Sequence, residues 1–301
     1  LGPNKTNTSR AGETCTLPSS FGTGTPPGSR LGSLRVRNHR RLSCRRSEST
    51  IPELAEVEQF RRRWDPGMGD EILRVDLHPL ARPLREVNAA SLRRNLKGAR
   101  LAGSEARGKW ILFRFLPRGW LGVHLGMTGR LVAEDGSSGI RSRRGQTAGN
   151  RDSKVVFRDA DVIRLSWRFE RRHQHLILHQ AHRALVFSDP RQFGRVRFEE
   201  GAEPPAWWTE MPPAVLSGEF RRASVAGFLR RHARAPIKAV LLRQEAFPGI
   251  GNWMADEILW RAGIHPGLEA GRLGEAEVGR LWKEIRAVAR AALRTVGAKG
   301  E

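Results

Sequence analysis

Two residues whose types could do chemistry, a proline and a glutamate, lie near the start of the string Ile51-Pro52-Glu53-Leu54-Ala55-Glu56-Val57-Glu58. Proline at a first turn followed by acidic residues is typical of a helix start, because the helix dipole favours negative charge there. A proline that begins a chain also carries a free amine, and a free α-amine with a pKa of about 8 is partly neutral and nucleophilic at pH 7. In the given chain Pro52 follows Ile51, so its nitrogen is an amide with a delocalised lone pair. The string therefore predicts a helix start, and amine chemistry only for a chain that begins at Pro52.

A lysine and a methionine stand at two predicted turns. Lys109 follows Gly108 and precedes the apolar run 110–115, and an isolated lysine at such a strand edge is usually solvated. Met127 lies in His124-Leu125-Gly126-Met127-Thr128-Gly129-Arg130-Leu131, where two glycines mark a turn. A methionine ordinarily fills space in a core. On local grounds, these two residues indicate a surface charge and a core side chain.

A third turn is indicated by Ser188-Asp189-Pro190-Arg191-Gln192-Phe193-Gly194, since Asp-Pro and Gly punctuate it. Arg191 and Phe193 both lie within this turn. Upstream, His173-Gln174-His175 offers two imidazoles in an otherwise ordinary stretch.

The longest informative stretch runs from Ile237 to Pro266. Gly249 and Gly251 permit a tight turn between two helices, and the N-terminus of the second helix is expected to present backbone N–H groups to a phosphate. Glu257 is expected to face inward and brace the turn. Side-chain donors for the phosphate backbone are expected from Arg234, Lys238 and Asn252.

Taken together and in this order, these strings resemble the motifs of the formamidopyrimidine-DNA glycosylase/endonuclease VIII family. Residues 51–58 are similar to the family's Met-Pro-Glu-Leu-Pro-Glu-Val-Glu, 124–129 to His-Leu-Gly-Met-Ser/Thr-Gly, and 189–194 to Asp-Pro-Arg-Arg-Phe-Gly. Residues 237–266 resemble its helix–two-turn–helix signature, and the likeness covers about 52–133 and 171–297. The departures from the pattern are Ala55, Gln174 and Gln192, and the last of these removes an arginine that would contact a phosphate or base.

The resemblance implies a role for each of these residues. Pro52, freed as the N-terminus, would attack the sugar C1′ as the damaged base leaves, with Glu53 as the general acid. The resulting iminium would drive strand cleavage, and Lys109 would reach the scissile phosphate and assist this elimination. Met127 would insert where the damaged nucleotide was flipped out, which offsets part of the lost stacking. The other implied DNA contacts are His173, Arg191 at the orphaned base, Phe193 as a wedge, Arg234, Lys238 and Asn252.

The function predicted on this basis is base-excision repair. Oxidised purines, such as 8-oxoguanine and formamidopyrimidines, would be excised from duplex DNA, with AP-lyase cleavage through an N-terminal proline iminium. The expected partner is double-stranded DNA that contains an oxidised base or an abasic site, bound by a monomer. Because some isoleucine codons can initiate with methionine, we expect the active protein to start at position 51.

Two alternatives follow from the same residues. A catalytically dead module that binds damaged DNA would result from an internal Pro52 and from the lack of the family's C-terminal finger after Gly297. An RNA binder of the ribosomal type is disfavoured, because such a protein would not need Pro52, Lys109 and Met127 in the family's order.

The composition agrees with a polyanionic partner. The chain has 53 Lys+Arg against 31 Asp+Glu, a net charge of +22, which is typical of nucleic-acid binding but does not separate an enzyme from a binder. The two cysteines, Cys15 and Cys44, cannot form a zinc finger, so we expect no metal and no cofactor in this chain. No apolar run approaches the ~20 residues of a membrane span. We expect an intracellular protein of the cytoplasm and nucleoid, without organelle targeting by residues 1–50.

The elements that must position these residues form an α+β arrangement. The pattern predicts an opening helix from about 52 to 64, then strands at 110–115, 119–125, 154–157, 162–168, 175–179, 184–188 and 194–198. Helices follow, among them 254–262 and an amphipathic one from Val278 to Ala292. The resemblance makes the first part a β-sandwich. We therefore expect a disordered, non-native extension at 1–50, a catalytic sandwich domain at 51–205 with a loop insertion near 134–170, and a helix–two-turn–helix domain at 206–301 without a C-terminal finger.

Overall fold

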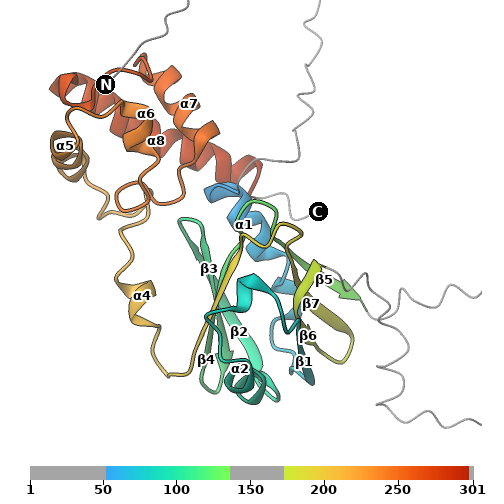
Figure 1. Cartoon of the computed structure of the whole chain (residues 1–301). Helices are drawn as coiled ribbons and strands as arrows, with labels where there is room; N and C mark the ends of the chain where they lie inside the picture. Colours follow the sequence, from blue (N-terminus) through green and yellow to red (C-terminus); the bar gives the residue numbers. More distant parts are fainter. Residues whose placement is uncertain (1–51, 136–172, 298–301) are drawn as a thin grey trace, which may run out of the picture. The chain divides into compact units, whose positions relative to one another are not determined.

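The computed structural model describes residues 52–135 and 173–297 (Figure 1). The extension expected at 1–50, the strands expected at 154–157 and 162–168, and most of the loop insertion at 134–170 lie outside the described residues. The other predicted elements occur in the predicted order, in which a helix precedes the strands and a series of helices comes last. The structure adds elements that the sequence pattern did not indicate, namely strands at Arg74–Leu77, Arg100–Arg107 and Arg130–Asp135 and a helix at Ala89–Leu96.

The first part is a β-sandwich that follows helix α1 (Leu54–Arg62). One antiparallel sheet has the order β1-β6-β7-β5 and the other the order β2-β3-β4-β8, and the two sheets face each other in Figure 1. The strands are β1 (Arg74–Leu77), β2 (Arg100–Arg107), β3 (Trp110–Leu116), β4 (Gly119–His124), β5 (Arg130–Asp135), β6 (Gln174–His179), β7 (Arg183–Ser188) and β8 (Arg195–Glu199). Helix α2 (Ala89–Leu96) and the short 3-10 turns η1 (Asp65–Gly67) and η2 (Arg82–Leu84) connect them. The predicted sandwich opened by a helix is confirmed.

The core of the sandwich follows from the two-residue period of its strands. Along β3, alternate side chains at Ile111, Phe113 and Phe115 are buried between the sheets. Phe187 of β7 joins the same core from the opposite sheet, and the ring of Trp64, just beyond α1, lies 4.6 Å from that of Phe113. Burial of each such side chain contributes about 1.5–3 kcal/mol. This core holds α1, and with it the residues just before α1, against the sandwich.

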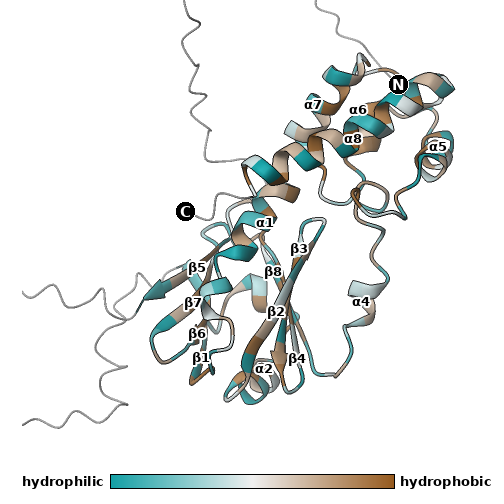
Figure 2. Ribbon diagram, turned by 180° about the vertical axis from the view of Figure 1, so that it is seen from behind, coloured by the Kyte–Doolittle hydropathy of each residue, from teal (hydrophilic) through white to brown (hydrophobic). Residues whose placement is uncertain are grey.

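The second part consists of helices around a core of its own. They are α4 (Ala206–Thr209), α5 (Arg222–Arg231), α6 (Ile237–Leu241), α7 (Asn252–Ala262) and α8 (Glu275–Thr295), with the 3-10 turn η5 (Ala270–Arg272) before the last. Hydrophilic and hydrophobic segments alternate along α8 in Figure 2, and its predicted apolar stripe is buried at Val278, Leu281, Ile285, Val288, Ala289 and Ala292. Helix α7 ends at Gly263, whose φ of +65° is the left-handed conformation common at helix C-termini.

The α+β class is thus confirmed. Helix α4 begins at Ala206, beside the expected domain boundary at 205/206, and that boundary stays a prediction. Over 52–135 and 173–297, no helix combines the length and the apolar character needed to cross a lipid bilayer.

Two phenylalanines, one inside the core of the sandwich and one outside it, should differ in what they contribute to stability. Phe113 is fully buried, whereas Phe193 is 49% exposed. We expect Phe113→Ala to lower the free energy of unfolding by about 3–5 kcal/mol, because it leaves a cavity between the sheets. Phe193→Ala should lower it by less than about 1 kcal/mol. Urea denaturation measures both, and equal losses would contradict the assigned core.

Candidate active site

The side chain of Glu53 joins the start of the sandwich to the start of a distant helix. Glu53 directly precedes α1 and is 3% exposed. Its Oε2 accepts hydrogen bonds from the backbone N–H groups of Gly251 at 3.0 Å and Met254 at 3.1 Å, and its Oε1 accepts one from Trp253 at 3.0 Å. The first turn of a helix leaves such donors without intrahelical partners. Glu53 therefore caps α7 from about 200 positions away in the sequence.

This cap corrects one expectation from the sequence. The N–H groups at the start of α7 were expected to bind a phosphate, but three of them donate to Glu53 instead. An anion is indeed held at this helix N-terminus, as the helix dipole favours, and the anion is a side chain of the same protein.

Two glycines make this contact sterically possible. A Cβ atom on Gly251 would lie 2.2 Å from Oε1 of Glu53, so only glycine leaves room for the carboxyl group. Gly249 has a φ of +89°, and its carbonyl oxygen accepts the N–H of Leu54 at 3.0 Å. The predicted tight turn between α6 and α7 is therefore also the surface on which the first residues of α1 pack.

Burial raises the pKa of Glu53 from 4.5 to about 7. The three backbone donors and the charge of Lys109 favour the carboxylate, but the loss of water outweighs them. Burial likewise lowers the pKa of Lys109 below its ordinary value of 10.5, while the charge of Glu53 opposes that change. Near neutral pH the Glu53 carboxyl is therefore divided between its acid and carboxylate forms, within electrostatic reach of a lysine.

Lys109 is held by the turn between β2 and β3. Gly108, with a φ of +61°, forms this turn, and a Cβ added to it would lie 3.1 Å from Cβ of Pro248 and 3.4 Å from the nitrogen of Gly249. The turn of the sandwich thus contacts the turn before α7, which brings Lys109 toward Glu53. The charges of these two residues, which were named separately from the sequence, influence each other's pKa.

The antiparallel register gathers the remaining loops at the same end of one sheet. Trp110, the residue after Lys109, pairs with His124 at the end of β4, and His124 pairs with Arg195 at the start of β8. The Met127 turn leaves β4 at this end, and the turn with Arg191 and Phe193 enters β8 there. A Cβ on Gly126 would lie 2.5 Å from the nitrogen of Gly194, so these two turns are in direct contact.

Asp189 ties the two turns together, a role that the sequence analysis missed. It is fully buried, its Oδ1 accepts the hydroxyl of Thr128 at 2.6 Å, and its Oδ2 accepts the N–H of Gly194 at 2.7 Å. Oγ1 of Thr128 in turn accepts the N–H of Arg191 at 3.3 Å. The only sequence signal for this role was an acidic residue at the end of a buried strand. Asp189 fixes where Met127 and Arg191 stand relative to each other.

Arg191 and Phe193 are exposed on the turn that Asp189 connects to the Met127 turn. The guanidinium carbon of Arg191 lies 5.0 Å from the centroid of the Phe193 ring, within cation–π range. Gln192 between them has a φ of 56°, and its Oε1 accepts the backbone N–H of Arg82 at 3.0 Å. The residue that departs from the family pattern therefore holds the neighbouring turn η2, while the two side chains beside it face outward.

His124 is a partly buried residue that the sequence analysis did not single out. Its Nδ1 accepts the N–H of Gly126 at 3.1 Å. Burial, together with the charges of Lys109 and Arg195, lowers the pKa of His124 to about 4, so the imidazole is neutral at pH 7. It orients the Met127 turn by accepting this hydrogen bond.

The other predicted DNA contacts are more scattered. His173 is half-buried, and its carbonyl oxygen accepts the N–H of Asp189 at 2.9 Å. Arg234 and Asn252 are exposed, and Asn252 is the first residue of α7. Nζ of Lys238 lies 2.7 Å from Oδ1 of Asp256, so its charge is already paired in this structure.

The expectation for Glu257 is wrong. Instead of bracing the turn from inside, its Oε1 lies 2.6 Å from Nε of Arg261 on the surface of α7. The i,i+4 spacing on one helix makes this ion pair local. Within the described ranges no three His, Cys, Asp or Glu side chains are grouped so that they could hold a metal ion.

Two protein-family models match the chain. The formamidopyrimidine-DNA glycosylase N-terminal domain matches residues 51–196, and the formamidopyrimidine-DNA glycosylase H2TH domain matches residues 212–300. A formamidopyrimidine-DNA glycosylase of Paracoccus denitrificans is 35% identical over 257 residues, which cover 82% of this chain and 80% of that protein. That of Moorella thermoacetica is 33% identical over 237 residues, covering 77% and 74%.

Solved structures agree in fold. Lactococcus lactis Fpg bound non-covalently to DNA with an AP site has a TM-score of 0.64 and 24% identity, over 82% of this chain and 83% of that chain. The complex of the wild-type Lactococcus lactis protein with DNA containing an oxidised pyrimidine has a TM-score of 0.65 at the same identity, over 83% and 82%.

The Glu53 cap is open to a simple steric test. We expect Gly251→Ala to lower the free energy of unfolding by roughly 2 kcal/mol or more, because the added Cβ displaces a buried carboxyl group from its donors. Gly274→Ala, at the N-cap of α8, is the matched control, since its Cβ would come no closer than 3.7 Å to Glu277. That change should cost at most about 1 kcal/mol. Similar losses in the two variants, measured by denaturant unfolding, would contradict the cap.

Proposed function

Because the chain belongs to the formamidopyrimidine-DNA glycosylase family, we propose that it excises oxidised purines from duplex DNA and cleaves the strand at the resulting abasic site. The observation that carries the proposal is the Glu53 carboxyl group, buried next to Pro52 and within electrostatic reach of Lys109. The proposed substrate is double-stranded DNA with an oxidised base or an abasic site, bound by a monomer.

Pro52 supplies the nucleophile when it is the first residue of the chain. Its secondary amine attacks C1′ of the damaged nucleotide, a C–N bond forms, and the bond from C1′ to the base breaks with its electron pair going to the base. The C1′–O4′ bond then breaks, and the ring oxygen keeps the electron pair and takes up a proton. The nitrogen loses its proton, and its lone pair forms the double bond of an iminium to C1′. The reaction uses groups of the protein alone, and no cofactor enters it.

Glu53 supplies the proton for the departing group. A general acid works best when its pKa lies near the working pH, and burial brings the pKa of Glu53 to about 7. The three N–H donors of α7 hold the carboxyl group in place while it gains and loses that proton. Burial thus raises the pKa of Glu53 toward neutral pH, and the capping contact holds its carboxyl group in position.

Lys109 assists the second step. The iminium makes the C2′ proton acidic, and its removal expels the 3′-phosphate with the electrons of the C3′–O bond. A partly buried amine within electrostatic reach of Glu53 can stabilise the negative charge that develops on that phosphate. This role depends on the position of the β2–β3 turn against Pro248 and Gly249.

The two turns joined by Asp189 are suited to hold a duplex from which a nucleotide has been flipped out. Flipping costs a few kcal/mol of stacking, and a flexible apolar side chain such as Met127 offsets part of it by filling the space. Arg191 and the exposed ring of Phe193 stand on the adjoining turn, where a cation and an aromatic face can contact the orphaned base. The further contacts that we propose to the DNA backbone are His173, Arg234, Lys238 and Asn252. For Lys238 to bind a phosphate, it must first leave its ion pair with Asp256.

One observation favours a second candidate. In the 301-residue chain the Pro52 nitrogen is an amide, because Ile51 precedes it. That nitrogen cannot form an iminium. With this nitrogen blocked, the protein would be a binder of damaged DNA.

Borohydride trapping on an abasic or 8-oxoguanine duplex separates the two candidates. We expect a covalent adduct with a chain that begins at Pro52, after removal of an initiating methionine, and none with the 301-residue chain. If neither chain forms an adduct, the proposed enzymatic activity is wrong and the DNA-binding candidate is left. An adduct with both would place the reacting amine elsewhere, for instance at Lys109.

A further inference from the structure

A cluster of aromatic side chains lies on the outer face of the sheet β2-β3-β4-β8. It has a buried set, Leu112, Trp120 and Trp208, and a partly buried set, Trp110, Trp207 and Met211. We call these six residues the tryptophan cluster. Two of them, Trp207 and Trp208, belong to α4, in the segment that connects the sandwich to the helical part. The connecting segment is therefore packed onto the sheet.

Trp207 fits a space that the sheet leaves open for it. A Cβ on Gly122 would lie 2.6 Å from the Trp207 ring, so a larger residue in β4 would push the ring away. The Trp207 ring centroid lies 5.1 Å from that of Trp110. The guanidinium carbon of Arg197 lies 5.2 Å from the ring centroids of both tryptophans, a pair of cation–π contacts.

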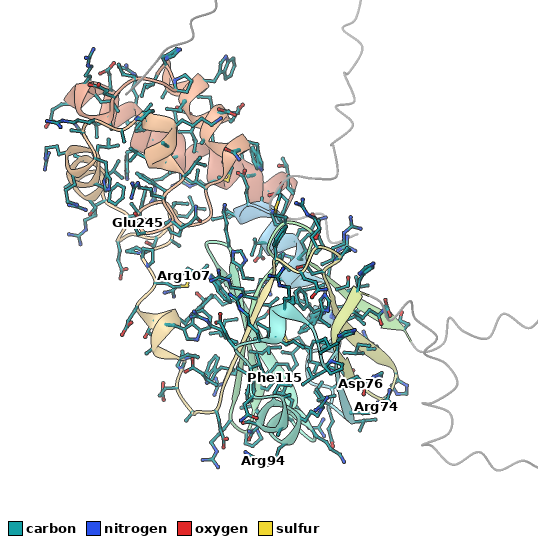
Figure 3. All side chains as sticks on the ribbon, in the orientation of Figure 1. Arg74, Asp76, Arg94, Arg107, Phe115 and Glu245 are labelled. Carbon is teal, nitrogen blue, oxygen red and sulfur yellow. The ribbon has the colours of Figure 1, made fainter. Side chains whose placement is uncertain are left out.

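Trp208 makes a similar cation–π contact with Arg107, the last residue of β2. It is 2% exposed, and the guanidinium carbon of Arg107 lies 5.0 Å from its ring centroid. Nη1 of Arg107 also donates to the carbonyl oxygen of Trp208 at 3.1 Å. Figure 3 labels Arg107 at the end of β2.

The two residues held by α4 are the ones that flank the turn of Lys109. Arg107 and Trp110 form the last pair of the β2–β3 register, with only Gly108 and Lys109 between them. Trp208 holds Arg107, and Trp207 holds Trp110. On its other side the turn contacts Pro248 and Gly249. The hairpin tip is therefore fixed by the connecting segment as well as by the turn before α7.

From this arrangement we propose that Trp207 and Trp208 are positioning residues that set the place of Lys109 for strand cleavage. The inference rests on the proposed function, in which Lys109 acts on the scissile phosphate. Neither tryptophan touches DNA in this account. They act because a displacement of about 1 Å in a reacting group can cost roughly 100-fold in rate.

The test uses the chain that begins at Pro52 and a duplex with a pre-formed abasic site. We expect Trp207→Ala and Trp208→Ala to lower the single-turnover rate of strand cleavage by roughly 10- to 100-fold. The Kd for a duplex with a non-cleavable abasic analogue should change by less than about threefold, and Trp208→Phe should restore most of the rate. Trp282→Ala is the matched control, because Trp282 makes a cation–π contact with Arg286 and donates to the carbonyl oxygen of Phe220 outside the cluster. It should leave the rate unchanged.

A double-mutant cycle separates positioning from general loss of structure. In a Lys109→Ala background, Trp207→Ala should lower the cleavage rate no further, because both changes remove the same contribution. Additive losses, or losses in affinity as large as those in rate, would overturn the proposal.

A readout without activity keeps this test apart from that of the proposed function. The lysines are methylated with ¹³C and the Lys109 signal is assigned by its absence in Lys109→Ala. Its titration midpoint should rise toward the ordinary value in Trp207→Ala, since a loosened turn lets water reach the amine. If the unmutated chain that begins at Pro52 does not cleave the duplex, the proposed function is wrong. If the titration midpoint of Lys109 does not change in Trp207→Ala, the positioning role is wrong.

Discussion

The contact on which the rest of the site depends is the hydrogen bonding of one carboxyl group to the start of a helix. Glu53 stands just before α1, and three backbone N–H groups at the start of α7 donate to it. Two opposing effects meet there: loss of water favours the neutral acid, and the donors favour the carboxylate. Their balance puts the pKa of Glu53 at about 7. A group bound only to stabilise α7 would gain from being fully charged, so a pKa near 7 is better suited to proton transfer.

The same contact determines where Lys109 stands. Gly251 leaves room for the Glu53 carboxyl group. Gly249, two residues earlier, accepts the N–H of Leu54 and packs against Gly108 of the β2–β3 turn. Packing of backbone on backbone thus brings Lys109 within electrostatic reach of Glu53, and such packing tolerates little displacement. The tryptophan cluster holds the opposite side of that turn. The reactive groups are positioned by two turns and a connecting segment, each fixed by residues that bear no reactive group themselves.

The sequence predicted the elements better than the contacts between them. The two-residue period of β3, the apolar stripe of α8 and the glycines of the α6–α7 turn each specify local conformation, and the structure has all three. The partners of Glu53 lie about 200 positions away, and no periodicity reports such a contact. For the same reason the buried role of Asp189 and the contacts of Trp207 and Trp208 were missed. Glu257 was assigned wrongly because a neighbour on its own helix, Arg261, satisfies it at the surface.

The central claim is that burial brings the pKa of Glu53 near neutral pH, while the start of α7 holds its carboxyl group in place. The most direct measurement is an NMR titration of the chain labelled with ¹³C-glutamate, with the Glu53 carboxyl signal assigned by its absence in Glu53→Gln. The account predicts a midpoint near pH 7. Below that pH Glu53 carries its proton, and above it the proton is lost. A midpoint near the ordinary 4.5 would mean that the carboxyl group is solvated and charged at pH 7, and it would contradict both the buried contact and the role of Glu53 as a general acid.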